Sequence, residues 1–415
     1  MGGLVQQRDF DVQAPWLAEL RTAGLRAFEK HGFPTAKTEE WKYTKPRALN
    51  VDDYVLAVAG GKTEKEEIPF DCYPFYFNNG VFDGHIPDLP EGIEVLSLEQ
   101  AVQEDFVKDY LGKAADVSDK PFAALNQYYL SSGLCFHVLP FVRLDKPLVF
   151  INHTSAEETN LLMNIRNLIV VENGAQVELV EYYRYSGAVK SRYLSNIVNE
   201  IFLNDDSRLR HYKVQNEAFK AGHIALTAVN VGKGAFYKSL TLQVGADIAR
   251  NETHVKLLAE QARAEVNAAY QMNGWATIDT TTDIEHLAPC TLSEQLVKGV
   301  VGGEAKGVFQ GKIHIAPNAV KTEGRQLHKA LLLSDTAEVD AKPELEIFAD
   351  DVKCSHGAAS GELDEEQLFY MQSRGIERET AKQILIDAYL EELIAKVEDE
   401  NIRKWIKLKI KTGNL

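Results

Sequence analysis

The sequence predicts a mainly β chain whose strand-rich centre is flanked by helical ends. Helical periodicity nearly disappears between residues 120 and 350, where short β-branched runs are separated by polar turns. Helical patterns occur before and after this region. The chain has 415 residues and an apolar fraction of 45%. That length is too great for one ordinary compact core, but it suits one elongated repeat domain with smaller flanking parts.

The N-terminal region, residues 1–115, is expected to be a mostly helical domain. A helix is predicted over residues 14–31, because four large apolar residues share one face and Gly32 and Pro34 stand where a helix should stop. Those four residues are Leu17, Leu20, Leu25 and Phe28. The following run FPTAKTEEWKYT, residues 33–44, is expected to be a structural hinge packed against this helix.

A weak internal repeat runs through the predicted core, residues 116–355. Each unit has a polar or glycine turn, a small residue and then alternating strand positions. The spacings between the small residues are 32, 28, 27, 43 and 32, and we interpret residues 276–296, within the long interval, as an insertion. The spacing fits one or two coils of a β-solenoid, whereas a β-sandwich remains the alternative. The small residues are Ala175, Ser207, Ala235, Ala262, Ala305 and Ala337.

The C-terminal region, residues 356–415, is expected to be helical. Asp364 is a good N-cap for a first helix that ends at Gly375, and a second helix is predicted from about 377 to 397. The tail from residue 401 is basic and apolar, so its large side chains need cover from this chain or from a partner. They are Trp405, Ile406, Leu408 and Ile410.

Composition excludes several classes of protein. A formal net charge of −16 argues against non-specific nucleic-acid binding, which needs a basic face. No stretch approaches 18 apolar residues and the start lacks the apolar core of a signal peptide, so we expect a cytoplasmic protein without membrane spans, or a plastid protein if a transit peptide was removed. The four cysteines have neither disulfide-framework nor ferredoxin spacing, so no stably held cofactor is expected.

Cys354 and His356 are the candidate metal ligands. Residues i and i+2 of a strand project from one face, and thiolate and imidazole both bind iron or zinc well. Two ligands from one strand cannot complete a tetrahedral site, which favours a transient site shared across a subunit interface. The alternative is a buried cysteine beside a hydrogen-bonded histidine at a strand end.

Catalytic signatures are weak, and we expect no enzyme. GxSxG and HExxH are both absent. Asp279 and Asp283 could form paired carboxylates as in polysaccharide-cleaving β-helices, although polar turn residues are the plainer interpretation. Glu285 and His286, near Cys290, are expected to lie in a surface turn. Two functions remain as alternatives to a protein with a shared metal site. One is a secreted-type β-helix carbohydrate-active enzyme, and the other is an interaction solenoid without a metal role.

Two long runs resemble a known family. FPTAKTEEWKYT at residues 33–44 and KPELEIFADDVKCSHGAASGELDEEQLFYMQSRGI at residues 342–376 closely resemble the SufB/SufD family of scaffold subunits in SUF iron–sulfur cluster assembly. The element CSHG at residues 354–357 favours the SufD branch over the SufB branch. Residues 358–360 are Ala-Ala-Ser, where family members often carry Ala-Thr-Val.

The resemblance implies a right-handed parallel β-helix between helical ends. It implies pairing with SufB through the β-helix, a homodimer when the protein is alone, and a transient iron or nascent cluster held by Cys354 and His356 at the SufB interface, with His356 the better candidate. It also implies that the C-terminal helices dock the SufC ATPase, so that ATP hydrolysis belongs to that partner. The expected docking residues are Leu368, Phe369, Ile384, Leu385 and Tyr389.

Overall fold

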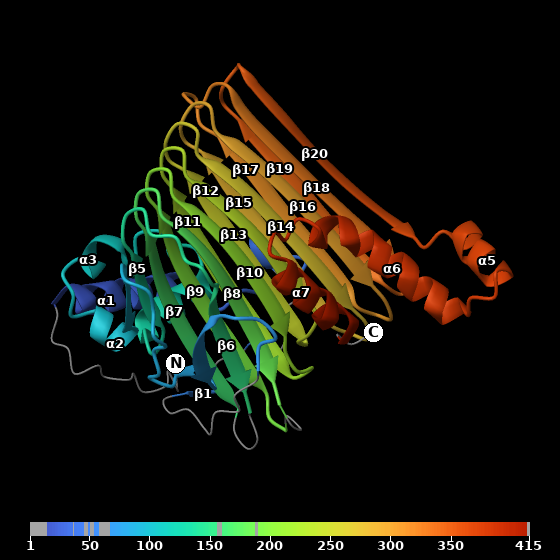
Figure 1. Cartoon of the computed structure of the whole chain (residues 1–415), viewed down its shortest axis with the longest axis horizontal. Helices are drawn as coiled ribbons and strands as arrows, with labels where there is room; N and C mark the ends of the chain where they lie inside the picture. The colour runs from blue at the N-terminus through green and yellow to red at the C-terminus, as the bar shows by residue number, and fades with distance from the viewer. Residues whose placement is uncertain are drawn as a thin grey trace.

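The chain folds as a parallel β-solenoid of about seven turns with helices near both ends (Figure 1). The structure, a computed structural model, describes residues 15–35, 37–44, 49, 54–57, 67–155, 160–186 and 190–412. The predicted solenoid is therefore confirmed, and the sandwich alternative is wrong. In the part of the chain described, no helix is both long and apolar enough to span a membrane.

Two parallel sheets form the walls of the solenoid. Sheet A contains, in spatial order, β19 (Glu338–Ile347), β17 (Lys306–Ile315), β15 (Thr277–His286), β13 (Ile248–Leu257), β11 (Ala221–Val231), β9 (Tyr193–Leu203), β7 (Leu161–Val171), β5 (Leu134–Val138) and β4 (Ile93–Ser97), with β1 (Val55–Leu56) also beside β7. Sheet B contains β20 (Val352–Glu362), β18 (Thr322–Leu332), β16 (Leu292–Val301), β14 (Arg263–Met272), β12 (Phe236–Gln243), β10 (Arg208–Asn216), β8 (Gln176–Tyr185), β6 (Leu148–Thr154), β2 (Tyr73–Asn78) and β3 (Val81–Phe82).

Each coil supplies one strand to each sheet. Arg208 of β10 pairs with Gln176 of β8, 32 residues earlier, and with Phe236 of β12, 28 residues later. One repeat unit is therefore one coil, and equivalent side chains stack along the axis. Because apolar residues of both sheets point inward, the stacked coils share one continuous core that no single coil could bury alone.

The turns before six sheet-B strands, β8, β10, β12, β14, β16 and β18, explain the repeat. The third residue of each turn has positive φ, between 58° and 68°, and the next residue is small because another turn packs on it. The Gly174 amide, for example, donates to the carbonyl of Asp205 at 2.9 Å, and Ala175 is buried. The left-handed positions, which suit Gly or a short polar residue, are Gly174, Asp206, Gly234, Gln261, Cys290 and Lys321.

The predicted insertion at residues 276–296 is wrong. This segment supplies β15, one turn and the start of β16, which form an ordinary coil. The small residues up to Ala262 precede sheet-B strands, whereas Ala305 and Ala337 precede sheet-A strands. Ala262 therefore lies at one edge of the solenoid and Ala305 at the other. The 43 residues between them span about one and a half coils.

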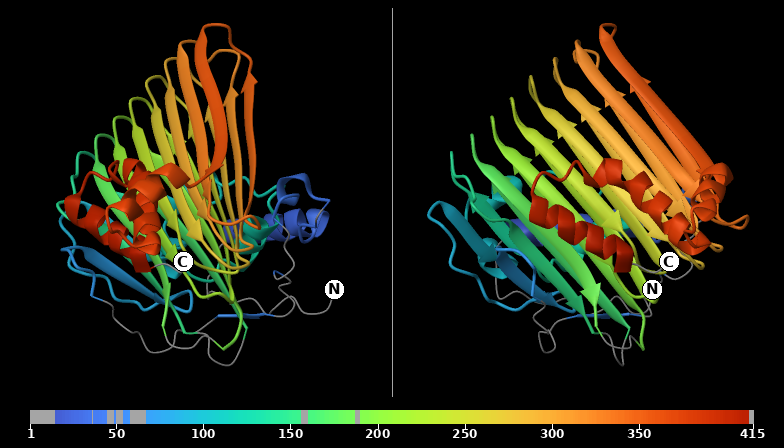
Figure 2. Two further views of the ribbon diagram at one scale, coloured as in Figure 1. Left: turned by 90° about the vertical axis from the view of Figure 1, so that its right-hand side faces the viewer. Right: turned by 45° about the vertical axis from the view of Figure 1, so that its right-hand side comes forward.

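Helices cover the outer faces of both sheets. α1 (Pro15–His31) packs with α4 (Pro121–Tyr129) on sheet A near its N-terminal end, and this confirms the predicted first helix. α6 (Arg378–Ile394) and α7 (Glu400–Thr412) lie on sheet B, while α5 (Glu365–Ser373) projects beyond it (Figures 1 and 2). The remaining short helices are η1 (Glu39–Trp41), α2 (Leu98–Ala101) and α3 (Val107–Tyr110).

The expected domain limits do not coincide with breaks in the sheets. The described residues of the N-terminal region supply β1 to β4 as well as helices, so this region extends both sheets. At the other end β20 continues past residue 355 to Glu362, so His356 belongs to the solenoid. Asp364 then caps α5, its carboxylate accepting the amide of Glu366 at 2.9 Å, as expected.

Candidate functional site

The C-terminal end of the solenoid is open. Among the described strands, β19 pairs only with β17 and β20 only with β18, so each sheet ends in a strand with one free edge. Both strands are ten residues or longer, and most of their residues are exposed or half-buried. A free edge presents unpaired backbone N–H and C=O groups, which can pair with a strand of another chain.

Pro343 interrupts the free edge of β19. The amides of Glu338 and Phe348 donate to Ala305 and Ile315 on the β17 side, at 3.1 and 3.0 Å. Because successive peptide groups of a strand point to opposite sides, the odd-numbered residues between them face the free edge. Pro343 is the middle one and has no N–H, which is tolerated only at a sheet edge. A partner strand must therefore place no acceptor opposite it.

Cys354 and His356 lie on the inward face of the last coil. They are directly opposite Gly324 and Gln326 of β18, and these even-numbered residues of β18 are buried. The two side chains therefore share one face, as the strand spacing predicted. They lie within β20 and not at a strand end, because the strand continues to Glu362.

Cys354 and His356 have different surroundings. Cys354 is half-buried over Gly324 and packs on an apolar cluster that includes Ile313 and Ala349. Burial raises the pKa of its thiol, although a hydrogen bond from the Gly324 backbone opposes this. His356 is exposed, and Gln326 opposite it is buried with an Oε1 that accepts no hydrogen bond from any described residue. The face thus offers a protonated thiol and an accessible imidazole.

Alkylation should reveal the raised pKa of Cys354. Only the thiolate reacts, so labelling by iodoacetamide should be slow at pH 7 and rise about tenfold per pH unit through pH 9. Exposed Cys290 should react first and Cys354 second. Cys72 and Cys135 should react last, since burial raises their pKa to about 11 and about 12. Peptide mass spectrometry gives the order; fast labelling of Cys354 at pH 7 would contradict the assignment.

The expected docking residues are not all accessible. Phe369 is 74% exposed and Ile384 is exposed, whereas Leu385 is half-buried. Leu368 is fully buried in its own chain, so its assignment to a partner surface is wrong. Tyr389 is half-buried on sheet B, where the Lys298 ammonium lies 4.5 Å from its ring centre and donates to its carbonyl at 2.6 Å.

Two features near these residues were not predicted. Tyr370, next to Phe369, is also exposed and enlarges the aromatic surface of α5. A groove of about 350 Å³ lies between α6 and α7. It could not be foreseen because the sequence does not show how α6 and α7 pack against each other. Its lining includes Leu390, Ile394, Leu408 and Ile410.

The run 33–44 is clamped to the outer face of sheet A. The Arg250 guanidinium donates to the Glu40 carbonyl at 2.7 Å and lies 4.6 Å from the Trp41 ring centre. Arg250 also contacts Asp279 at 2.6 Å, and Asp279 accepts a hydrogen bond from Thr44. The run therefore packs chiefly on the sheet through this buried ion pair, and among its described residues only Phe33 contacts a ring of the first helix, Phe28. Its role as a hinge stays a prediction.

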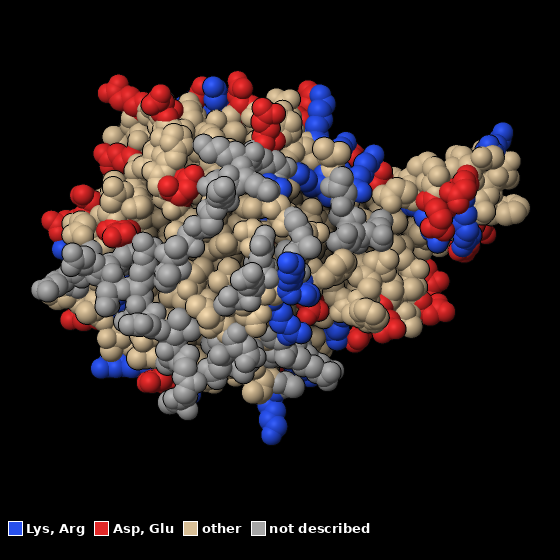
Figure 3. Space-filling model, turned by 90° about the horizontal axis from the view of Figure 1, so that it is seen from below, with Lys and Arg blue, Asp and Glu red and all other residues tan. Residues whose placement is uncertain are grey.

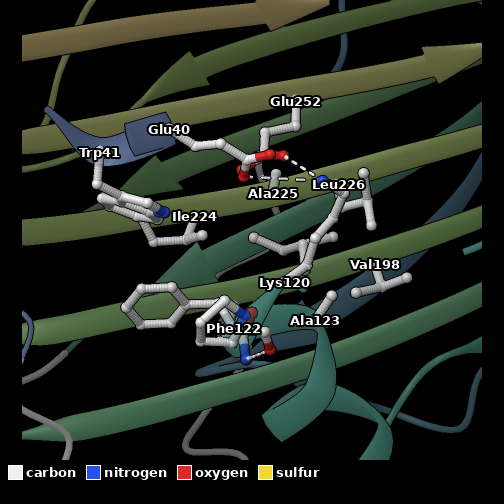
Figure 4. Close-up of a pocket in the computed structure, with 13 residues that line it drawn as sticks. Glu40, Trp41, Lys120, Phe122, Ala123, Val198, Ile224, Ala225, Leu226 and Glu252 are labelled. Atoms are coloured by element: carbon white, nitrogen blue, oxygen red, sulfur yellow. Dashed lines mark hydrogen bonds and ion pairs between the residues drawn. The ribbon is translucent and has the colours of Figure 1, made fainter. Parts of the chain in front are cut away.

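A small cavity with a mainly apolar lining and a few charged residues lies beside this clamp (Figure 4). Lys120 is 3.9 Å from both Glu40 and Glu252 at its mouth. The cavity has a volume of about 20 Å³, which is enough for one water molecule. Burial alone would raise the pKa of Glu252, but Arg250 holds that pKa well below its usual value. The ionised carboxylate therefore belongs to the clamp.

The possible catalytic residues do not form a catalytic pair. Asp279 and Asp283 lie on one face of β15, four residues and so about 13 Å apart, beyond the reach of paired glycosidase carboxylates. The turn interpretation is also wrong, because both lie in a strand. His286 is buried in the solenoid, where its ring contacts Thr291 and Ser293 at 2.8 Å each and burial lowers its pKa to about 4.

Fold and site together define a β-solenoid that ends in two free strand edges, a form suited to end-to-end association. The chain belongs to the SufBD family of the SUF system, which gives it a general role in iron–sulfur cluster assembly. Residues 152–389 match the family described as "SUF system FeS cluster assembly, SufBD core domain", and residues 6–150 match the "SufBD protein N-terminal region".

Relatives align along most of the chain. The SufBD family protein slr0076 of Synechocystis is 30% identical, over 88% of this chain and 84% of the relative. The iron–sulfur cluster assembly protein SufD of Escherichia coli is 29% identical, over 93% of this chain and 90% of the relative. Protein ABCI7, chloroplastic, of Arabidopsis thaliana is 28% identical, over 93% of this chain and 84% of the relative. The resemblance in residues 33–44 and 342–376 is thus confirmed.

Proposed function

We propose that this protein is a non-catalytic scaffold subunit that pairs with SufB through β19 and β20. The observation that carries the proposal is the open end of the solenoid, where two free edges flank Cys354 and His356. An edge strand can extend its sheet into another solenoid, and the joined sheets would enclose the inward-facing side chains. The nascent cluster is then cargo at the joint between the two subunits.

Cys354 and His356 would supply part of a ligand set. Thiolate and imidazole are suitable ligands for iron, but a tetrahedral site needs two more, which SufB would provide. The exposed imidazole can bind first. The thiol has a raised pKa and must lose its proton when the metal binds, so affinity should rise with pH. A ligand set divided between two chains suits release as well as assembly.

The C-terminal helices would dock the SufC ATPase. Phe369, Tyr370 and Ile384 are exposed on α5 and α6, and such aromatic and aliphatic residues are typical interface anchors. Figure 3 shows from below that the α5 end protrudes from the body and carries acidic and basic side chains. SufC binding ATP would move this end only if its contacts differ between nucleotide states. ATP hydrolysis would occur in SufC.

The cytoplasm, or a plastid, is the compartment we propose. Iron–sulfur intermediates with a free thiol need a reducing environment, and all four cysteines are free. The printed name of ABCI7 places that relative in the chloroplast. In the absence of SufB, the same free edges would allow a homodimer.

Size-exclusion chromatography with mass determination tests the proposal. This protein, SufB and SufC should form a complex with one copy of each scaffold and two of the ATPase. Phe369→Asp should reduce SufC association about tenfold or more, because it places a charge in the centre of an apolar contact. SufB pairing should persist, because Phe369 lies on α5, beyond the last residue of β20, and is not part of either edge strand.

The matched control is Phe219→Asp. Phe219 is 58% exposed but lies in the turn between β10 and β11, on the body of the solenoid. The Phe219→Asp variant should associate with SufC as the wild type does. If the wild-type protein binds neither SufB nor SufC, the scaffold role is refuted. If both variants bind SufC equally, the dock lies elsewhere.

A further inference from the structure

We propose that the outward row of β19 selects a partner strand that carries Lys or Arg, and that it favours such a strand over a second copy of this chain, which pairs only when that partner is absent. The inference rests on the proposed pairing with SufB and specifies the chemistry of that contact. The row consists of five charged side chains on the outer face of sheet A: Glu338, Asp340, Lys342, Glu344 and Glu346.

Several opposite charges face each other across neighbouring strands on the outer face of sheet A. On β13 and β15, Lys256 faces Glu285 at 3.8 Å and Arg250 contacts Asp279. On β15 and β17, Asp283 stands opposite Lys312 in the register. Asp283 is therefore followed by a basic residue on β17, as expected if opposite charges on adjacent strands attract, whereas Asp279 stands opposite Val308.

β19 continues this pairing of opposite charges and is the last strand of sheet A. Lys306 of β17 contacts Glu338 at 2.9 Å, and Lys312 contacts Glu346 at 2.9 Å. Glu344 lies 3.4 Å from Lys342 on its own strand and stands opposite Lys312 of β17 in the register. The side chains of Glu338, Glu344 and Glu346 remain 46–61% exposed. The lysines of β17 thus show which neighbours the carboxylates of this row accept. Lys342 also lies 3.6 Å from Glu39 of η1, but no described strand pairs with the free side of β19.

A second copy fits the row poorly. A twofold axis that joins the two sheet-A edges makes β19 antiparallel to its copy. Aligned about Lys342, Glu338 would face Glu346 and Asp340 would face Glu344. Every register that brings Lys342 opposite a carboxylate leaves another carboxylate facing its like. Like charges directly opposite are destabilising, whereas a partner strand with Lys or Arg at these positions would pair without conflict.

Charge reversal tests the inference. We would compare Glu338→Lys/Glu344→Lys with Glu104→Lys/Glu260→Lys, which reverses two exposed carboxylates away from both free edges and changes the net charge equally. At low salt, the edge variant should bind SufB about tenfold more weakly than the control, from two reversed cross-strand pairs. Wild-type binding should weaken as salt rises, and this dependence should diminish in the edge variant.

Self-association should change in the opposite direction. Sedimentation of the edge variant alone should show a stronger homodimer than the control, because the two introduced lysines would face the remaining carboxylates of the second copy. Weaker binding to SufB together with a stronger homodimer indicates a change of partner preference, because a misfolded variant would lose both contacts. If the edge variant matches the control in both assays while the wild type still binds SufB, the inference is overturned and the pairing stands. If the wild type does not bind SufB at any salt, the proposed function itself fails.

Discussion

Replacing His356 by alanine is expected to abolish iron–sulfur cluster assembly in cells while the complex with SufB and SufC still forms. The side chain is exposed on the inward face of β20 and makes no described hydrogen bond, so its removal should change the free energy of unfolding by less than about 0.5 kcal/mol. A metal site shared between chains would lose one of its few ligands. The activity of a cluster-dependent enzyme, in cells lacking the wild-type protein, measures the loss.

Two companion variants make this result specific. His356→Cys retains a ligating atom and should restore part of the assembly activity. Ser355→Ala changes the neighbouring exposed residue, whose side chain points to the other face of β20, and should behave as the wild type. Loss of the complex in His356→Ala would make the residue structural. Normal assembly in that variant would favour an interaction solenoid without a metal role.

The solenoid could be predicted from the sequence because its turns repeat a geometric requirement. The turns that precede β8 to β18 of sheet B need a left-handed position followed by a small residue, as at Gly174 and Ala175, so the spacing of small residues records the coil length. Small residues also occur in turns at the other edge, as at Ala305 and Ala337, although no left-handed residue directly precedes them there. A linear sequence does not label the edges, and the change of edge between Ala262 and Ala305 was therefore mistaken for an insertion.

The candidate site was predictable only where local geometry decides it. Strand periodicity places Cys354 and His356 on one face whatever the rest of the fold does. The nine-residue helix α5 is short and weakly amphipathic, so its sequence did not separate buried Leu368 from exposed Phe369. The clamp could not be predicted from the sequence, because it joins Thr44 to Asp279 across 235 residues and no local pattern connects the two.

Arg250→Met is expected to give the largest loss of stability among single changes at this clamp, about 3–5 kcal/mol. The guanidinium is buried with Asp279 and Glu252, at 2.6 and 2.7 Å, and both carboxylates would be left in a site that disfavours charge. Residues 39–44 should detach from sheet A, because the Glu40 carbonyl and the Trp41 ring lose the same partner. Thermal and urea unfolding measure the loss, and tryptophan fluorescence reports the detachment.

Arg210→Met is the matched control, because it removes the same side chain from a pair that water screens. Arg210 and Glu398 are 2.5 Å apart, but their side chains are 38% and 48% exposed, so this change should cost less than about 1 kcal/mol. Adding Asp279→Leu to Arg250→Met should recover part of the stability, since it removes one of the stranded charges. Equal losses in the two arginine variants would contradict the clamp, because burial is the main property that separates the two ion pairs.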